Sequence, residues 1–283
     1  MPVLRRIMLS RCFAFLIFCL AGLLPLSASS SGFPTSDKDK DKERDAYVEK
    51  SLPMPDALPP VLHSASAVRF LAEYRMPTGT YLPTGLTGID VSHYQGIIDW
   101  AEVASDPSVR FAYVKATEAS SLRDSYMQRN LKGARSVRIP VGVYHFFSPT
   151  ASVEEQLSNF LGNVKPQEMD LIPIIDVEKR GRSSIQVFNS RLQKFLLQVE
   201  NAYGVKPIIY TYMNFYNRYM VGLYGQYNFM IASYSEDIPQ LIDNPKMILW
   251  QFTSEGKVQG VRTHVDRSRF MGDHGLKDIL LHR

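Results

Sequence analysis

Cysteine is almost absent from this chain. Its 283 residues include only Cys12 and Cys19, both near the N-terminus. They fall in a segment with the pattern of an export signal, in which arginines precede an apolar run over residues 13–26 and small residues 27–30 follow. Removal of residues 1–28 would leave no cysteine. A disulfide framework is then excluded, and we expect a large hydrophobic core to stabilise the exported protein.

The chain also lacks a strong charge imbalance and a long apolar run. The run over residues 13–26 is shorter than the about 20 apolar residues that a membrane-spanning helix needs. We therefore predict a cleaved signal peptide, with an uncleaved anchor as the alternative, and a location in the periplasm, the cell envelope or the extracellular space. Without residues 1–28, 29 basic and 28 acidic residues remain. This balance argues against a nucleic-acid partner.

The segment after the predicted signal has little that could form a core. Residues 37–45 (DKDKDKERD) alternate acids and bases, and a proline-rich stretch follows, a composition typical of a solvated tether. Residues 65–74 have the spacing of one short amphipathic helix. The chain is therefore predicted to divide into a signal peptide, a linker, one folded domain and a C-terminal tail, at residues 1–28, 29–85, 86–272 and 273–283, respectively.

Apolar, β-rich runs alternate with helical periodicity in the predicted domain. The predicted strands are 87–92, 110–117, 140–147, 171–178, 206–212, 227–233, 246–252 and 262–266. Several are apolar on both faces, as parallel strands covered by helices are. The pattern predicts an α/β fold, an irregular and trimmed (β/α)8-like barrel, with a doubly wound open sheet as the alternative. Because about 190 residues is short for this barrel, some crossovers should be loops.

Local signals also mark the helices between these strands. Ser152 with Glu155, and Ser183 with Gln186, are predicted to form capping boxes at two helix starts. Gly204 is predicted to end the longest helix in a left-handed conformation.

A pair of carboxylates ends the fourth predicted strand. Asp176 and Glu178 close the sequence PIIDVE and are one residue apart. Side chains alternate along a strand, so these two share one face, with their Cα atoms about 6.6 Å apart. Their repulsion and burial should raise the pKa of one of them. A protonated acid beside an ionised one suits glycoside hydrolysis, although the same pattern also occurs at solvated strand ends.

Further acids and aromatic residues collect near the ends of the predicted strands, where (β/α)8 barrels form their active sites. For several of them a structural role is an open alternative: Glu118 as an ion pair with Lys115, His145 as a hydrogen-bonded barrel residue, and the aromatic residues as core. No two histidines have the spacing of metal ligands, so neither a metal nor another cofactor is expected. The candidates are Asp90, Tyr94, Glu118, Tyr144, His145, Tyr210, Tyr212, Trp250, Gln251 and Asp266.

Motifs along the domain, taken in order, resemble those of glycoside hydrolase family 25, the Chalaropsis-type lysozymes. They are GIDVSHYQG (88–96), IDW (98–100), FAYVKATE (111–118), GVYHFF (142–147), PIIDVE (173–178), PIIYT (207–211), WQFTS (250–254) and VD (265–266). The resemblance implies an irregular (β/α) barrel that hydrolyses the β-1,4 bond between N-acetylmuramic acid and N-acetylglucosamine in peptidoglycan. It also implies that Glu178 is the general acid/base, Asp176 its catalytic partner, and Asp90 and Asp266 the remaining acids.

Two positions depart from the family pattern. Ala119 stands where the family usually has glycine, so the loop there is expected to take another path. Arg267 and Ser268 follow Val265-Asp266, where the family often has a further residue and asparagine. These departures bear on how the substrate fits more than on the acid chemistry.

We therefore predict an exported, monomeric muramidase that acts on peptidoglycan glycan strands and has no protein partner. The alternatives are a hydrolase of another N-acetylated β-1,4 glycan, such as chitin, and a non-catalytic glycan-binding barrel. Direct attack and water activation both need carboxylates on opposite faces of the sugar. The shared face of Asp176 and Glu178 favours substrate assistance instead, in which the 2-acetamido group attacks the anomeric carbon.

Overall fold

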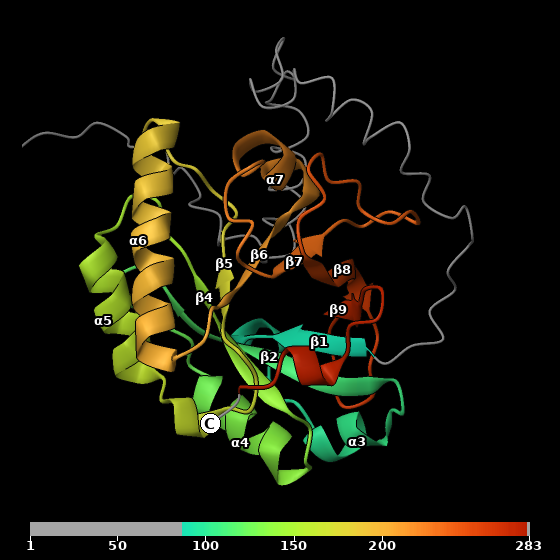
Figure 1. Cartoon of the computed structure of the whole chain (residues 1–283). Coiled ribbons are helices and arrows are strands. Elements are labelled where there is room, and N and C mark those ends of the chain that lie inside the picture. The colour runs from blue at the N-terminus through green and yellow to red at the C-terminus, as the bar shows by residue number, and fades with distance from the viewer. Residues whose placement is uncertain (1–86, 282–283) are drawn as a thin grey trace, which may run out of the picture.

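Eight strands close into a barrel in the computed structural model, which describes residues 87–281 (Figure 1). The order around the barrel is β1-β9-β8-β7-β6-β5-β4-β2, and pairing of β1 with β2 closes it. Closure confirms the predicted barrel over an open sheet. The strands are β1 (Thr87–Val91), β2 (Val109–Glu118), β4 (Val141–Phe146), β5 (Ile174–Asp176), β6 (Ile208–Tyr212), β7 (Phe229–Ala232), β8 (Met247–Gly256) and β9 (Val265–Phe270), and a short β3 (Leu122–Arg123) pairs with the end of β2.

The last strand runs against the others. Strands β1, β2 and β4 to β8 pair in parallel, whereas β9 is antiparallel to both of its neighbours, β8 and β1. The C-terminal ends of seven strands and the N-terminal end of β9 therefore lie at the same end of the barrel. We call this end the C-terminal end of the barrel.

Helices cover part of the outside of the barrel. In Figure 1, α5 and α6 stand together beside β4 and β5, and α3 and α4 lie beneath β1 and β2. No helix separates β7 from β8 or β8 from β9 within the described chain, as expected for a trimmed barrel. The helices are α3 (Trp100–Ser105), α4 (Met127–Ser136), α5 (Val153–Asn163), α6 (Ile185–Tyr203) and α7 (Met213–Tyr219), with 3-10 turns η2 (His93–Gln95), η3 (Pro166–Glu168) and η4 (Leu276–Asp278).

Helix ends follow the local signals in part, because neither α5 nor α6 has the reciprocal bond of the predicted capping box. Ser152 caps α5 and accepts a hydrogen bond from the Glu155 amide, and Gly204 ends α6 with φ 71°. The residue that caps α6 is Ser184 rather than the predicted Ser183. The α6 helix starts at Ile185, and the Ser184 side chain accepts from the amide three residues on.

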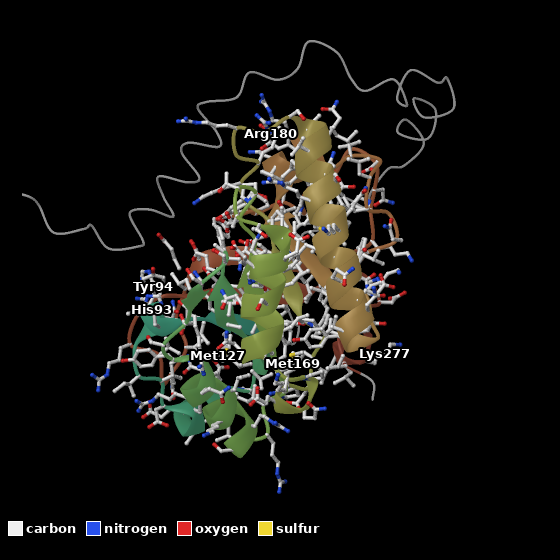
Figure 2. All side chains as sticks on the ribbon, turned by 90° about the vertical axis from the view of Figure 1, so that its left-hand side faces the viewer. His93, Tyr94, Met127, Met169, Arg180 and Lys277 are labelled. Carbon is white, nitrogen blue, oxygen red and sulfur yellow. The ribbon has the colours of Figure 1, made fainter. Side chains whose placement is uncertain are left out.

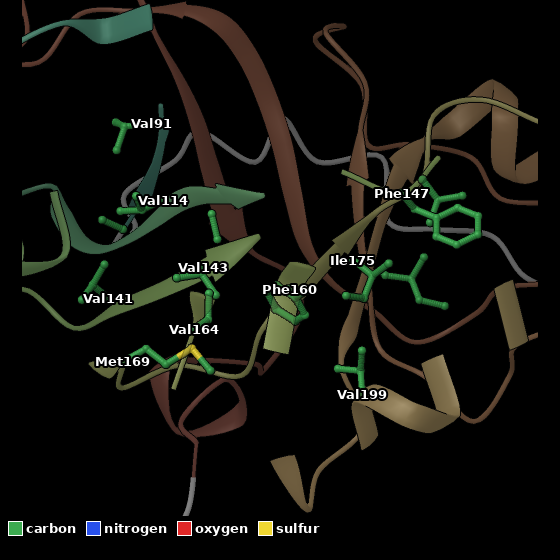
Figure 3. Packing of buried hydrophobic residues seen from close by; sticks show 14 of the residues in the cluster. Val91, Val114, Val141, Val143, Phe147, Phe160, Val164, Met169, Ile175 and Val199 are labelled. Carbon is green, nitrogen blue, oxygen red and sulfur yellow. The ribbon is translucent and has the colours of Figure 1, made fainter. Parts of the chain in front are cut away.

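Two hydrophobic clusters hold the barrel together. One lies between the strands and the helices, and Figure 3 shows Val143 and Ile175 of the strands with Phe160 and Val199 of the helices. The other fills the barrel interior. Burial of the strands on both faces explains their apolar runs. The interior cluster includes Phe111, Tyr113, Leu171, Ile172, Ile174, Ile208, Tyr210, Met230, Leu249 and Ile279.

Residues 273–281, predicted as a tail, pack against the barrel. Ile279 is fully buried within the interior cluster, and its carbonyl oxygen accepts from the Ile172 amide at 2.8 Å. No helix of residues 87–281 has both the length and the apolar character needed to cross a membrane. The predicted signal peptide (1–28), linker (29–85) and short helix (65–74) lie outside the described residues.

Gly88 leaves no room for a side chain in the barrel interior. A Cβ atom at Gly88 would lie 2.1 Å from the Phe111 ring, which is itself fully buried. We expect Gly88→Ala to lower the free energy of unfolding by about 1–3 kcal/mol, measured by urea denaturation. Gly162→Ala is the matched control, because Gly162 lies in α5 with nothing within 4 Å of its added Cβ. A Gly88→Ala variant as stable as the control would contradict close packing at Gly88.

Candidate active site

Four carboxylates meet at the C-terminal end of the barrel. Asp176 is the last residue of β5, and Glu178 follows two residues later. Asp90 of β1 lies directly opposite Asp266 of β9 in the antiparallel ladder. Asp266 reaches this end because β9 runs against the other strands, so that its second residue, rather than its last, lies there. Asp90, Asp176 and Glu178 are 8%, 7% and 9% exposed.

Asp176 and Glu178 lie on the interior side of the barrel wall. Val177, between them, packs in the cluster outside the barrel, and its carbonyl oxygen accepts from Thr211 Oγ1 at 2.6 Å. Burial raises the pKa of Tyr210 well above its usual value, and the charges of Glu178 and Asp176 contribute to the increase. Both carboxylates therefore lie close enough to affect the same hydroxyl group. The alternation predicted for these two side chains is present.

Gln251 links Asp90 to two tyrosines across the barrel interior. Its Nε2 donates to Asp90 Oδ2 at 2.9 Å, and its Oε1 accepts from Tyr210 at 2.9 Å and from Tyr234 at 2.8 Å. These residues come from strands that are not neighbours, or from the segment after β7, so the bonds cross the interior. Ser268 Oγ of β9 also donates to Asp90 Oδ2 at 3.1 Å. The carboxylate of Asp90 is thus fixed in orientation.

The surroundings of Asp90 favour its protonated form. Burial raises the pKa of Asp90 to about 6, and hydrogen bonds from Gln251 and Ser268 offset part of that increase. Asp90 Oδ1 is buried and has no hydrogen-bond partner within residues 87–281. A proton on this oxygen would avoid burial of a full negative charge. Asp90 can therefore remain neutral in mildly acidic solution.

Tyr144 shows how closely the acids surround one point. Burial raises the pKa of the Tyr144 hydroxyl well above its usual value, and four negative charges add to the increase. Because the neutral hydroxyl is strongly favoured, Tyr144 can serve as a hydrogen-bond donor among carboxylates. The carboxylates are those of Asp176, Asp266, Asp90 and Asp124, in order of decreasing effect.

Two predicted substrate contacts, His145 and Trp250, lie away from the acids. His145 is fully buried between the barrel and the helices, where its ring stacks on Phe195 and its Nδ1 is 2.8 Å from Thr117 Oγ1. Of the two readings of His145, the structure supports the hydrogen-bonded barrel residue. Trp250 is 1% exposed, and its ring lies beneath the Arg269 guanidinium, 4.0 Å from it.

Alternation along the strand explains both corrections. Adjacent residues in a strand point to opposite faces. Tyr144 and Gln251 point into the barrel, so His145 and Trp250 cannot. Trp250 Nε1 instead donates to the Ser233 carbonyl oxygen at 2.8 Å.

The remaining candidates lie at the rim of the site. Glu118 at the end of β2 accepts from Lys115 Nζ at 2.7 Å, so the ion pair left open from the sequence is formed. Tyr94 in η2 is 46% exposed and its ring lies 3.8 Å from that of His93, as Figure 2 shows at the molecule's surface. Tyr212 ends β6 and lies edge-on to Tyr210, 6.0 Å away.

Three residues around the site were not predicted as site residues from the sequence, although Ser268 was noted there as a departure from the family pattern. Ser268 and Tyr234 hold the network around Asp90, and Asp124 fixes the loop after β1. Asp124 Oδ2 accepts from the His93 amide at 3.0 Å and lies 2.6 Å from His93 Nδ1. Tyr234 follows β7 much as Tyr212 ends β6, so its position in the sequence could have indicated a place near the site. Asp124 carried no such signal, because its role depends on contacts 31 residues away in the chain.

Ala119 adopts the backbone conformation that glycine would favour. Its φ is 48°, and its amide donates to the Phe146 carbonyl oxygen at 3.1 Å. Alanine is therefore accommodated at this position in a left-handed conformation, at some cost in strain.

Residues 87–281 contain no group of three or more histidine, cysteine, aspartate or glutamate side chains arranged to hold a metal ion. An amide and a serine side chain hold the Asp90 carboxylate in place, and carboxylates can transfer protons and stabilise charge.

The raised pKa of Asp90 predicts a pH-dependent stability. Its ordinary value is 3.8 and its folded value is about 6, so the folded protein binds more protons between these pH values. The free energy of unfolding should then fall as pH rises from 4 to 7, by about 2 kcal/mol from this group. Asp90→Asn should remove that contribution, and urea denaturation across this range measures it. A stability difference between variant and wild type that stays constant with pH would contradict the prediction.

Comparison with known proteins places this geometry in context. The family model of glycosyl hydrolases family 25 matches residues 89–261. The chain is 38% identical over 191 residues to the uncharacterized protein YegX of Escherichia coli (strain K12), covering 65% of this chain and 69% of that protein. It is 28% identical over 203 residues to Lysozyme M1 of Streptomyces globisporus, covering 67% and 69%. A solved family 25 glycosyl hydrolase from Bacillus anthracis is similar with a TM-score of 0.62 and 33% identity, over 67% of this chain and 90% of that one.

Proposed function

The chain belongs to glycosyl hydrolase family 25, and on that premise we propose that it is an exported muramidase. Its substrate is the glycan of peptidoglycan, and it hydrolyses the β-1,4 bond from N-acetylmuramic acid to N-acetylglucosamine. The observation that carries this proposal is the set of buried acids at the C-terminal end of the barrel, with Asp176 and Glu178 on one face of β5 and its extension. Similarity to Lysozyme M1 supports it.

Glu178 is the general acid and then the general base. In the first step its proton moves to the glycosidic oxygen as the bond from this oxygen to the anomeric carbon breaks. The carbonyl oxygen of the substrate's 2-acetamido group bonds to that carbon and forms an oxazolinium ion. Water then attacks the same carbon, the bond from this carbon to the acetamido oxygen breaks, and a proton of the water moves to Glu178, which restores the acid. The product therefore keeps the configuration of the substrate.

Asp176 orients and stabilises the reacting acetamido group. Its carboxylate accepts a hydrogen bond from the amide N–H and stabilises the positive charge that develops on the ring. A nucleophilic role would require a carboxylate on the far side of the sugar from the acid, and Asp176 shares the side of Glu178. Asp90 and Asp266 act less directly, through their charge and by positioning the substrate.

The N-terminal part of the proposal concerns export. Residues 1–28 act as a signal peptide, or as an anchor if they are not removed, and residues 29–85 tether the enzyme outside the cytoplasm. The pattern of arginines, apolar run and small residues supports this assignment. Mass determination of the exported protein tests it, since cleavage should give a new N-terminus near residue 29.

Digestion of purified peptidoglycan tests the enzymatic assignment. The products are reduced with borohydride and hydrolysed, and the reduced amino sugar is identified. A muramidase yields reduced muramic acid. Reduced glucosamine would indicate cleavage of the other bond in the glycan, and preferential release from chitin oligomers would favour the chitinase-like alternative. Binding without any release of reducing ends would favour a glycan-binding barrel.

A further inference from the structure

Positively charged residues follow the proposed acid directly. After Glu178 the chain reads Lys179-Arg180-Gly181-Arg182, and we call these four residues the basic loop. Lys179 and Arg182 are exposed. None of the three cations has an ion-pair partner within residues 87–281. By contrast, Lys115, Lys194 and Lys206 each pair with a glutamate.

Contacts on both sides hold the basic loop in place. Gly181 has φ 70° and lies against Pro149, whose carbonyl oxygen accepts from Arg191 Nη1 of α6 at 2.7 Å. The Arg180 guanidinium donates to the Ser183 carbonyl oxygen and lies 5.6 Å from the centre of the Tyr219 ring. The charges are therefore presented by a fixed turn. Figure 2 shows Arg180 near the top of the molecule and Lys277 lower down, at its right-hand edge.

Lys179 also lies beside the acids. Its Nζ is 5.4 Å from the centre of the Phe146 ring, and Phe146 pairs with Asp176 across β4 and β5. Lys115 Nζ lies at the same distance from this ring. The site thus has negative charge inside the barrel and positive charge along the rim formed by the basic loop.

We propose that the basic loop binds the carboxylates of acidic peptides attached to the glycan. This inference rests on the proposed function. A glycan of N-acetylglucosamine alone is neutral, whereas the peptides carried by muramic acid residues in peptidoglycan have free carboxylates. The ionised acids of the site would repel such anions, and exposed lysine and arginine side chains offset that repulsion and bind carboxylates. The basic loop therefore selects strands whose peptides carry free carboxylates over strands whose peptides lack them.

Paired substrates and variants of the full chain test this binding. Purified peptidoglycan free of other anionic polymers is compared with the same peptidoglycan after carbodiimide coupling to ammonia has converted its peptide carboxylates to amides. For Lys179→Gln/Arg182→Gln we expect KM on the intact substrate to rise about fivefold to tenfold, while kcat changes little, because exposed charges act on binding and encounter. On the amidated peptidoglycan KM should change less than twofold. Added salt should weaken the wild-type preference, since screening acts over about 8 Å at 0.15 M.

Lys132→Gln/Lys277→Gln is the matched control. Both lysines are exposed and distant in sequence from the site, and the change in net charge is the same. The proposal is overturned if the control raises KM as much, or if the basic-loop variant weakens both substrates equally. If the wild type cleaves neither substrate, the proposed function fails. Co-sedimentation with the two insoluble substrates then still decides the inference, which predicts weaker retention of the basic-loop variant on intact peptidoglycan alone.

Discussion

Glu178→Gln should lower the turnover of purified peptidoglycan by about 10²–10⁴-fold and leave the fold intact. The amide keeps the size of the carboxyl group but cannot give a proton to the leaving oxygen. Glu178 is buried with Asp176 at the end of β5, so bulk water has little access to the position from which it could replace Glu178 as the acid. Release of reducing ends, measured at saturating substrate, gives the effect on kcat.

Glu155→Gln provides the control for this change. Glu155 is exposed on α5, so the same substitution there removes a charge without touching the site. We expect full activity from the control and an unchanged urea unfolding midpoint for both variants. A Glu178→Gln enzyme that keeps a third of wild-type activity would exclude Glu178 as the general acid.

Asp176→Asn should lower turnover about 10²–10³-fold, because a neutral amide stabilises the developing oxazolinium ion far less than a carboxylate does. Asp90→Asn and Asp266→Asn should have smaller effects, since these acids act through position and charge. The measurement is the rate of hydrolysis of a defined muropeptide or chitooligomer by each variant. Equal losses for all three would contradict the special role of Asp176.

The anomer released first decides the mechanism itself. Substrate assistance predicts net retention, so NMR should show the β-anomer before mutarotation mixes the two forms. Initial release of the α-anomer would mean inversion, with Asp90 or Asp266 activating water from the opposite face. The role inferred from the shared face of Asp176 and Glu178 would then be wrong, although both residues would remain in the site.

Local rules carried much of the fold. Apolar runs located seven strands of the barrel, whereas the last was predicted at 262–266 and lies at Val265–Phe270. Helix caps at Ser152 and Gly204 followed from their immediate neighbours. Two adjacent serines precede α6, so the local sequence does not decide which of them caps the helix. Ser183 was predicted, but Ser184 caps α6. The direction of β9 could not be predicted from its residues, because a short strand at the end of the domain can have the same sequence pattern whether it pairs in parallel or antiparallel.

The sequence by itself determined that Asp176 and Glu178 share a face, because that depends only on the two-residue period of a strand. It could not decide which residue of the pairs Tyr144–His145 and Trp250–Gln251 points into the barrel, since all four are buried or partly buried. Closure of the barrel and packing of the helices outside it determine that Tyr144 and Gln251 point inward. The bonds that join Asp90 to Gln251 and Ser268 connect residues more than 160 positions apart. Only the tertiary structure brings these side chains together, and with them the burial that raises the pKa of Asp90.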